Sequence, residues 1–341
     1  MGKSRPGLIL IASRYYRMGN STLFRRFVPT ALVISCWTLL FTSPSFAAGR
    51  ITAYRPVFEP CRAASGALQL AIRRFQVDGV PHLLLVNPRT LETSVTKADS
   101  LTAADSAEAR TLAHTPFVAA LDRYAASPYK LQNHGASRAV RPVDGLFLTV
   151  DMCPSKRPFE RELFAGVADL SAGTGGPSPV AVAMSGSWLE RHRDDLAWLK
   201  GEVAAGRLVI TWVNHSSSHP FDPKAPLEQN FLLTPGVDFD REVLATEVLL
   251  LENGLTPAPF FRFPGLVADG GLLAKLRKLS LIPIGSDAWL AKGEVPANGS
   301  FILVHGNGNE PQGVRKLLPL LRGENHIRLL PLREAFAAGV R

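Results

Sequence analysis

The chain has 341 residues, 46% hydrophobic and 20% charged, which is ordinary for a globular protein and enough for one large domain with a smaller companion. Its net charge of +9 does not indicate nucleic-acid binding, because residues 1–48 carry six of the positive charges and no acidic residue. The remainder, at +3, has no basic run, which excludes the usual signature of a nucleic-acid-binding protein, and nothing in it indicates a stable protein partner.

The first 48 residues have the pattern of an export signal. Two arginines precede the 15-residue apolar run FVPTALVISCWTLLF, and the small-residue segment SPSFAAG comes directly after it. This run is shorter than the roughly 20 residues that span a bilayer. We therefore expect cleavage after Ala47 or Ala48 and a periplasmic or secreted product, with an uncleaved membrane anchor as the alternative. Met18 would begin a more typical leader, so residues 1–17 are candidates for an over-extended start.

Two cysteines remain once the leader is removed, because Cys36 leaves with it. Export would place Cys61 and Cys153 in an oxidising compartment. A disulfide between them would close a long loop and constrain the unfolded chain. Two free buried thiols are the alternative, since the sequence does not show whether the two backbones come close enough for a bond.

Residues 49–140 predict a small α+β accessory region that packs on the C-terminal part of the chain. Strand-like alternation surrounds an Asp-Gly and an Asn-Pro turn signal. A helical segment, SAEARTLAHTPFVAALDRYAA, is interrupted by Pro116, and residues 135–142 have the composition of a linker. Arg73 and Arg74 are expected on a solvated face. We find no catalytic constellation in this region.

From residue 141 to 341 strand candidates alternate with helix candidates, which predicts a parallel sheet, doubly wound or closed into a barrel. The segment WLERHRDDLAWLKGEVAAG is expected to be one helix. The strand candidates are LFLTV, PVAVAMSG, RLVITWV, PAPFFRFP, IPIGS and FILVHG. Chemistry in a barrel lies on the loops at the carboxyl ends of the strands. The polar residues at those ends are Asp151, His215, His219, Arg262, Asp287 and His305.

Five of these segments together resemble a known family. The ordered set TVDMCP, HSSSH, RFPG, SDAW and LVH is similar to the NodB-like polysaccharide deacetylases, carbohydrate esterase family four. Each piece alone is weak, but five in the right order are specific. The resemblance covers roughly residues 143–341. It implies a distorted (β/α) barrel and a hydrolase that removes acetyl groups from a glycan with zinc or another divalent ion, cleaving C–N amide bonds and, as a second class, O-esters.

The resemblance also implies catalytic roles for four residues. Asp151 matches the general base, and Arg262 matches the arginine that holds this base ionised by opposite charge. His305 matches the general acid that protonates the leaving amine. Asp287 resembles the acid that orients or tunes this histidine, although one residue separates it from the following tryptophan where the family has none.

Metal and substrate contacts are implied by the same resemblance. His215 and His219 match the two histidine ligands of the metal. Trp289 and Leu303 match an apolar patch under the acetyl methyl group, and Pro264 is a further expected substrate contact.

The chain departs from the family where the metal-binding aspartate is expected. The family pattern Thr-Phe-Asp-Asp-Gly-Pro places that aspartate on Met152, and a thioether is a poor ligand for zinc and harder ions. Three replacements remain open: water, the Cys153 thiolate, or an oxygen of Asn214 or Asp222. A disulfide to Cys61 would exclude the second. Two other functions stay open for this reason: an inactive relative that binds glycan without turnover, and a metal-independent esterase.

Overall fold

The computed structural model describes residues 49–323 and 327–337. The expected leader, its cleavage site and the membrane-anchor alternative therefore lie outside the described residues. Those that are described belong to one compact unit. None of the helices in the described ranges is both long and apolar enough to cross a bilayer.

The N-terminal region forms an antiparallel sheet of five strands in the order β4-β3-β2-β1-β5. Its strands are β1 (Ile51–Arg62), β2 (Leu68–Val77), β3 (Val80–Val86), β4 (Thr93–Lys97) and β5 (Thr102–Ala103). The predicted Asp-Gly turn joins β2 to β3, and both of its residues have positive φ, as tight hairpin turns require. Two helices come next, α1 (Ser106–Thr111) and α2 (Pro116–Tyr124), and Pro116 stands at the first position of the second helix.

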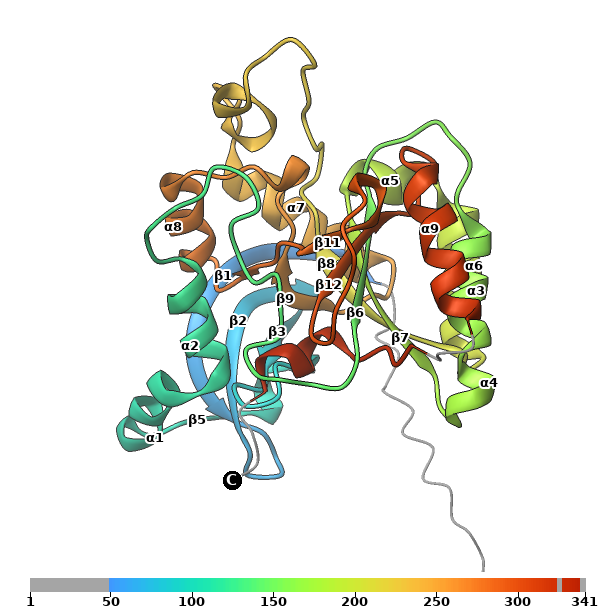
Figure 1. The fold of residues 1–341 in the computed structure, drawn as a ribbon. Helices are drawn as coiled ribbons and strands as arrows, with labels where there is room; N and C mark the ends of the chain where they lie inside the picture. Colours follow the sequence, from blue (N-terminus) through green and yellow to red (C-terminus); the bar gives the residue numbers. More distant parts are fainter. Residues whose placement is uncertain (1–48, 324–326, 338–341) are drawn as a thin grey trace, which may run out of the picture. The chain divides into compact units, whose positions relative to one another are not determined.

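The second sheet has seven strands in the order β10-β9-β8-β7-β6-β12-β11, and every neighbouring pair is parallel. Its strands are β6 (Phe147–Met152), β7 (Ser178–Met184), β8 (Leu208–Asn214), β9 (Pro257–Phe261), β10 (Ile282–Pro283), β11 (Ala288–Trp289) and β12 (Phe301–His305). The sheet is curled, with helices on its outer side (Figure 1). This confirms the predicted α/β fold, a distorted barrel preceded by a separate antiparallel sheet.

The helices of the barrel are α3 (Arg161–Asp169), α4 (Ser171–Thr174), α5 (Gly186–Arg191), α6 (Arg193–Ala204), α7 (Phe239–Glu252), α8 (Gly270–Lys278) and α9 (Pro311–Arg322). Helices α3, α6 and α9 lie together on one flank of the sheet (Figure 1). The prediction of a single helix over residues 188–206 is wrong, because this segment divides into α5 and α6 at His192. The backbone there leaves the helical region, and the His192 ring stacks on Trp188 with centroids 4.8 Å apart.

The segment expected to be a linker is bonded into the barrel on both sides. Ala136 N donates to Pro283 O at 2.9 Å, and Gly285 N donates to Ala136 O at 2.7 Å. On the other side, Phe301 N donates to Ser137 O at 3.1 Å. This segment therefore connects the β10 edge of the sheet to the beginning of β12.

Alternation along β6 decides which side chains reach the site. Leu148, Val150 and Met152 belong to the apolar cluster between the sheet and its helices. Because successive side chains of a strand point to opposite faces, Asp151 points to the inner side of the sheet. The inner side also carries Phe147, which shares an apolar core with buried residues of the N-terminal sheet.

A buried ion pair also joins the N-terminal sheet to helix α7. Arg73 on β2 and Glu247 on α7 are both fully buried, with Nε–Oε2 at 2.6 Å and Nη2–Oε1 at 2.8 Å. Tyr54 donates its hydroxyl to the same carboxylate, at 2.9 Å. The expectation that Arg73 is solvated is therefore wrong; its neighbour Arg74 is about one-third exposed and pairs with Glu59.

Candidate active site

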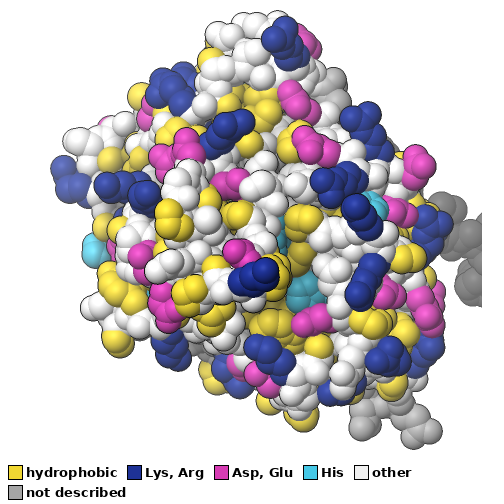
Figure 2. Space-filling view, turned by 90° about the horizontal axis from the view of Figure 1, so that it is seen from above, with side chains coloured by type: hydrophobic (Ala, Val, Ile, Leu, Met, Phe, Trp, Pro, Cys, Tyr) yellow, Lys and Arg dark blue, Asp and Glu magenta, His cyan; other side chains and the backbone are white. Residues whose placement is uncertain are grey.

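Asp151 and His305 lie at the carboxyl ends of neighbouring strands, β6 and β12, and stand side by side in the register of the sheet. The parallel pairing of β6 with β12 opposes Asp151 to His305 and Thr149 to Leu303. Because adjacent parallel strands place matched residues on the same face, both polar side chains point to one end of the barrel. Viewed from above in Figure 2, this face has a hollow in which histidine side chains are visible, bordered by hydrophobic and acidic groups.

Arg262 comes directly after β9 and lies beside Asp151, with Nη1 3.6 Å from Oδ1. Its Nη2 donates to Thr149 Oγ1 at 2.8 Å, which holds the buried guanidinium in place. Burial raises the pKa of Asp151, but the charge of Arg262 and, after it, the influence of three nearby histidines outweigh it, so the pKa lies below its ordinary value. The carboxylate is thus kept ionised, as a general base requires.

The loop that carries the two histidines, residues 215–219 directly after β8, is held by contacts to its side chains and backbone. His215 Nδ1 lies 2.7 Å from the carbonyl oxygen of Arg262, which can only accept a hydrogen bond. The proton is therefore on Nδ1, and the unprotonated Nε2 points towards the site. Glu242 on α7 accepts from Ser217 N at 2.9 Å, and from Ser218 N and Oγ at 2.8 and 2.6 Å.

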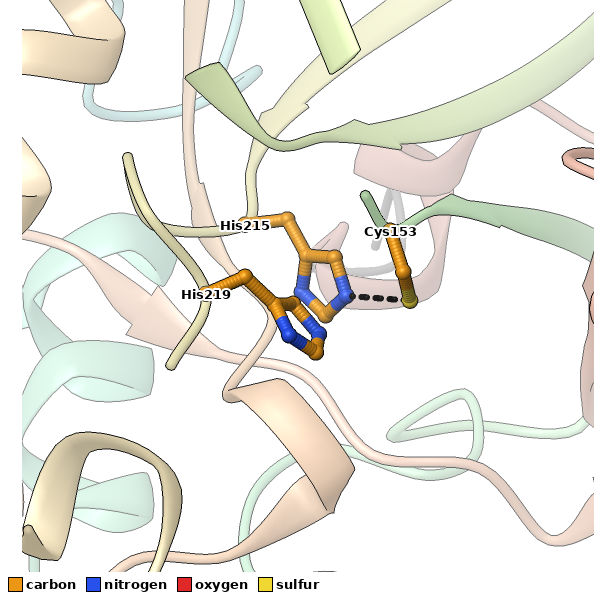
Figure 3. A group of neighbouring side chains, drawn as sticks. All are labelled: Cys153, His215 and His219. Atoms are coloured by element: carbon orange, nitrogen blue, oxygen red, sulfur yellow. Dashed lines mark hydrogen bonds between the residues drawn. The ribbon is translucent and has the colours of Figure 1, made fainter. Parts of the chain in front are cut away.

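His219 completes a cluster with His215 and Cys153. The two imidazole rings meet edge to face with centroids 4.7 Å apart. The Cys153 Sγ lies 3.4 Å from His215 Nε2, and one ligand atom from each of the three residues lies within 4.8 Å of the others (Figure 3). Within the described residues, His219 Nε2 is buried without a hydrogen-bond partner. Two imidazoles and a thiol are a donor set that fits zinc with an open fourth position.

The surroundings of Cys153 lower the pKa of its thiol. Burial raises the pKa of its thiol, but His219 and His305 lower it to about 7 overall. Cys61, in contrast, packs in a small apolar cluster of the N-terminal sheet, and burial raises the pKa of its thiol. Both cysteines are free, so the disulfide alternative is not formed.

His305 pairs with Glu310 and not with Asp287. Its Nδ1 lies 2.8 Å from Glu310 Oε2, and Trp289 Nε1 donates to the same oxygen at 2.8 Å. Asp287 instead accepts from Phe301 N at 2.9 Å and pairs with Arg138 at 2.8 Å. The orienting role expected of Asp287 thus belongs to Glu310 by contact. An acid directly before the proline that opens α9 was its only signal in the sequence.

The expected substrate contacts divide into one that borders the site and two that are buried. The Trp289 ring lies beside the ring of His305, with centroids 6.2 Å apart. Leu303 is buried on the inner side of β12, and Pro264 is buried at the start of a short 3₁₀ turn, Pro264–Leu266. Of the ligands considered for the gap left by Met152, the Asn214 amide is engaged by Val243 O and Ser216 N, and the Asp222 carboxylate accepts from Lys224 N at 2.9 Å.

Comparison with known proteins gives one family match outside the site and a set of distant structures. Residues 52–114 match the family model described as RP012 protein N-terminal domain. A family 4 carbohydrate esterase from Bacillus anthracis is 18% identical, with 60% of this chain and 87% of that one covered and a TM-score of 0.40. One from Streptomyces lividans, in complex with acetate, is 19% identical, with 55% and 92% covered and a TM-score of 0.36.

A CE4 family pseudoenzyme from Bacillus anthracis is also similar, at 13% identity, with 57% of this chain and 66% of that one covered and a TM-score of 0.38. The similar structures thus include esterases as well as a pseudoenzyme. TM-scores of 0.36 to 0.40 do not bear on the activity of this chain, which depends on the side chains at the strand ends.

Proposed function

We propose that the chain is an exported hydrolase that removes acetyl groups from an acetylated glycan, in the first place from N-acetylated sugars. One observation carries the proposal: a buried carboxylate, Asp151, and a partly buried imidazole, His305, lie opposite each other on neighbouring strands beside a cluster of metal-type ligands. Amide hydrolysis needs both a base and an acid, because water is a weak nucleophile and an amine is a poor leaving group.

Asp151 acts as the general base in this proposal. It takes a proton from water as the oxygen attacks the acyl carbon, which requires an ionised carboxylate at neutral pH. The Arg262 guanidinium favours that state and is itself fixed by the Thr149 hydroxyl. The water-derived oxygen stays on the acyl group, which leaves as acetate.

His305 acts as the general acid. Its imidazolium delivers a proton to the nitrogen as the C–N bond breaks, so it must be protonated when the substrate binds. Burial lowers the pKa of His305, but Cys153, Glu310 and Asp151 raise it well above the ordinary value. Glu310 also fixes the ring through Nδ1, and this leaves Nε2 to face the leaving group.

A divalent cation fits the cluster of two imidazoles and a thiol, with His215 and His219 as ligands. When bound, a cation such as zinc supplies Lewis-acid polarisation of the acyl oxygen. His215 presents an unprotonated Nε2 because its Nδ1 is fixed by a backbone carbonyl, an arrangement that metal-binding histidines commonly show.

Product analysis on N-acetylglucosamine oligomers tests the proposal. Purified mature protein loaded with zinc should release acetate and a free amine in equal amounts. A chelator should stop the release, and added zinc should restore it. Glycan binding with no acetate under any divalent cation would contradict the proposal and identify an inactive, glycan-binding relative. Turnover of activated esters alone, unaffected by the chelator, would identify a metal-independent esterase.

A further inference from the structure

The residue that aligns with the family's metal-binding aspartate does not face the site. Met152 is fully buried on the outer face of β6 in the apolar cluster between sheet and helices. Its sulfur is so close to Gly306 that a Cβ on that glycine would lie 2.8 Å from it. A carboxylate at position 152 would therefore be buried among apolar side chains, which disfavours its charged form.

The next residue, Cys153, reaches the histidines instead. Its sulfur is the one that lies 3.4 Å from His215 Nε2 (Figure 3). The side-chain amide of Asn307, which is itself fully buried, donates to the carbonyl of Cys153 at 2.8 Å. This bond ties the backbone of the residue after β6 to the loop after β12 and so holds Cys153 where its thiol reaches the histidines.

The two imidazoles complement this thiol. The tautomer of His215 leaves its Nε2 without a proton, and His219 Nε2 is buried without a hydrogen-bond partner in the described ranges. A buried polar atom without a partner is destabilising, and a bound cation would remove this cost. Two borderline nitrogens and one soft sulfur favour zinc over magnesium, calcium or manganese, which prefer oxygen.

We propose that Cys153 is the third protein ligand of a zinc site with His215 and His219, and that it replaces the carboxylate expected at position 152. This inference rests on the proposed function and deepens it, since it specifies the metal chemistry of the same site. It also makes a prediction opposite to that of the family pattern: Met152→Asp should not strengthen metal binding, because its carboxylate would point into the helix layer.

Cobalt binding to the purified protein, measured without substrate, tests the proposal. Cobalt bound to the wild-type protein should show the near-ultraviolet absorption of a thiolate-to-cobalt transition, and zinc should displace it. Cys153→Ser should lose this band and weaken zinc binding by more than the roughly 10- to 100-fold that loss of an outer partner causes. Cys61→Ser is the matched control and should keep both band and affinity.

A second variant covers the case in which Cys153→Ser folds poorly. Cys153→Asp should bind cobalt, because aspartate is also a ligand, but without the thiolate band. Bound cobalt without that band in the wild-type protein, full zinc affinity in Cys153→Ser, or a gain of affinity in Met152→Asp would each overturn the assignment. These experiments measure metal binding and not turnover. A failure of deacetylation therefore leaves the metal assignment intact, and a failure of the metal assignment leaves the deacetylation test intact.

Discussion

The imidazole of His305 and the carboxylate of Glu310 form an ion pair, with Nδ1 2.8 Å from Oε2. Glu310 is five residues further along the chain, directly before α9, and the Trp289 indole holds the same oxygen. The pair therefore fixes the orientation of the proposed general acid and contributes to its raised pKa.

Replacing Glu310 by glutamine should weaken His305 as an acid at neutral and alkaline pH. The amide keeps the shape of the side chain but removes the charge that favours the imidazolium. We expect the alkaline limb of kcat/KM to move to lower pH, with activity at pH 8 about tenfold lower. Asp287→Asn is the comparison, and the alkaline limb of its kcat/KM profile should stay at the wild-type pH. A shift in Asp287→Asn and none in Glu310→Gln would contradict the assignment.

The wild-type pH profile should be broad. Asp151 acts as a base only when ionised, and its pKa lies below the ordinary value, so activity should fall on the acid side only as pH drops through that lowered pKa. His305 acts as an acid only when protonated, and its pKa lies well above the ordinary value, so activity should persist past neutrality. An alkaline limb at or below the ordinary histidine pKa of about 6.5 would disagree with this geometry.

Glu242 should control metal affinity without touching the metal. Its carboxylate accepts three hydrogen bonds from Ser217 and Ser218, between the two histidines. Glu242→Gln replaces one acceptor oxygen by a donor, and zinc affinity should fall about 10- to 100-fold, as found for outer partners of metal ligands. Glu242→Asp should recover part of it, and Asp240→Asn, an exposed acid in the same helical turn, should change nothing. Equal zinc affinities in all four proteins would exclude the role.

The Arg73–Glu247 pair should be important for stability and not for chemistry. Both groups are fully buried, so Glu247→Gln leaves a buried guanidinium without its counter-ion. Chemical denaturation should show a loss of about 3–5 kcal/mol in the free energy of unfolding. The partly exposed pair Arg74–Glu59 is the matched control, and Glu59→Gln should cost less than about 1 kcal/mol. Similar losses for both variants would contradict the assignment.

The sequence predicted the barrel because its strands and helices alternate with clear periodicity. Strand ends in a parallel sheet meet at one edge, so the convergence of Asp151, Arg262, His215 and His305 could be predicted from topology and family pattern alone. Strand β1 was not predicted, since its prolines and charged residues mask the alternation that marks a strand.

Other features could not be predicted because they depend on contacts between distant segments. Whether residue 152 or 153 faces the histidines is set by where β6 ends, and a shift of one residue exchanges the two faces. Arg73 resembles any surface arginine until Glu247, 174 positions away, is placed against it. Glu310 was overlooked for a similar reason, because a single acid in a loop carries no signal without its partner.

Acetate release by active-site variants tests the central claim most directly, namely that Asp151 and His305 act together on one acyl group. With zinc-loaded protein and N-acetylglucosamine oligomers, Asp151→Asn and His305→Ala should each lower kcat about 10²- to 10⁴-fold. The exposed control His114→Ala should retain wild-type activity. Wild-type turnover that survives in Asp151→Asn or in His305→Ala would contradict the account.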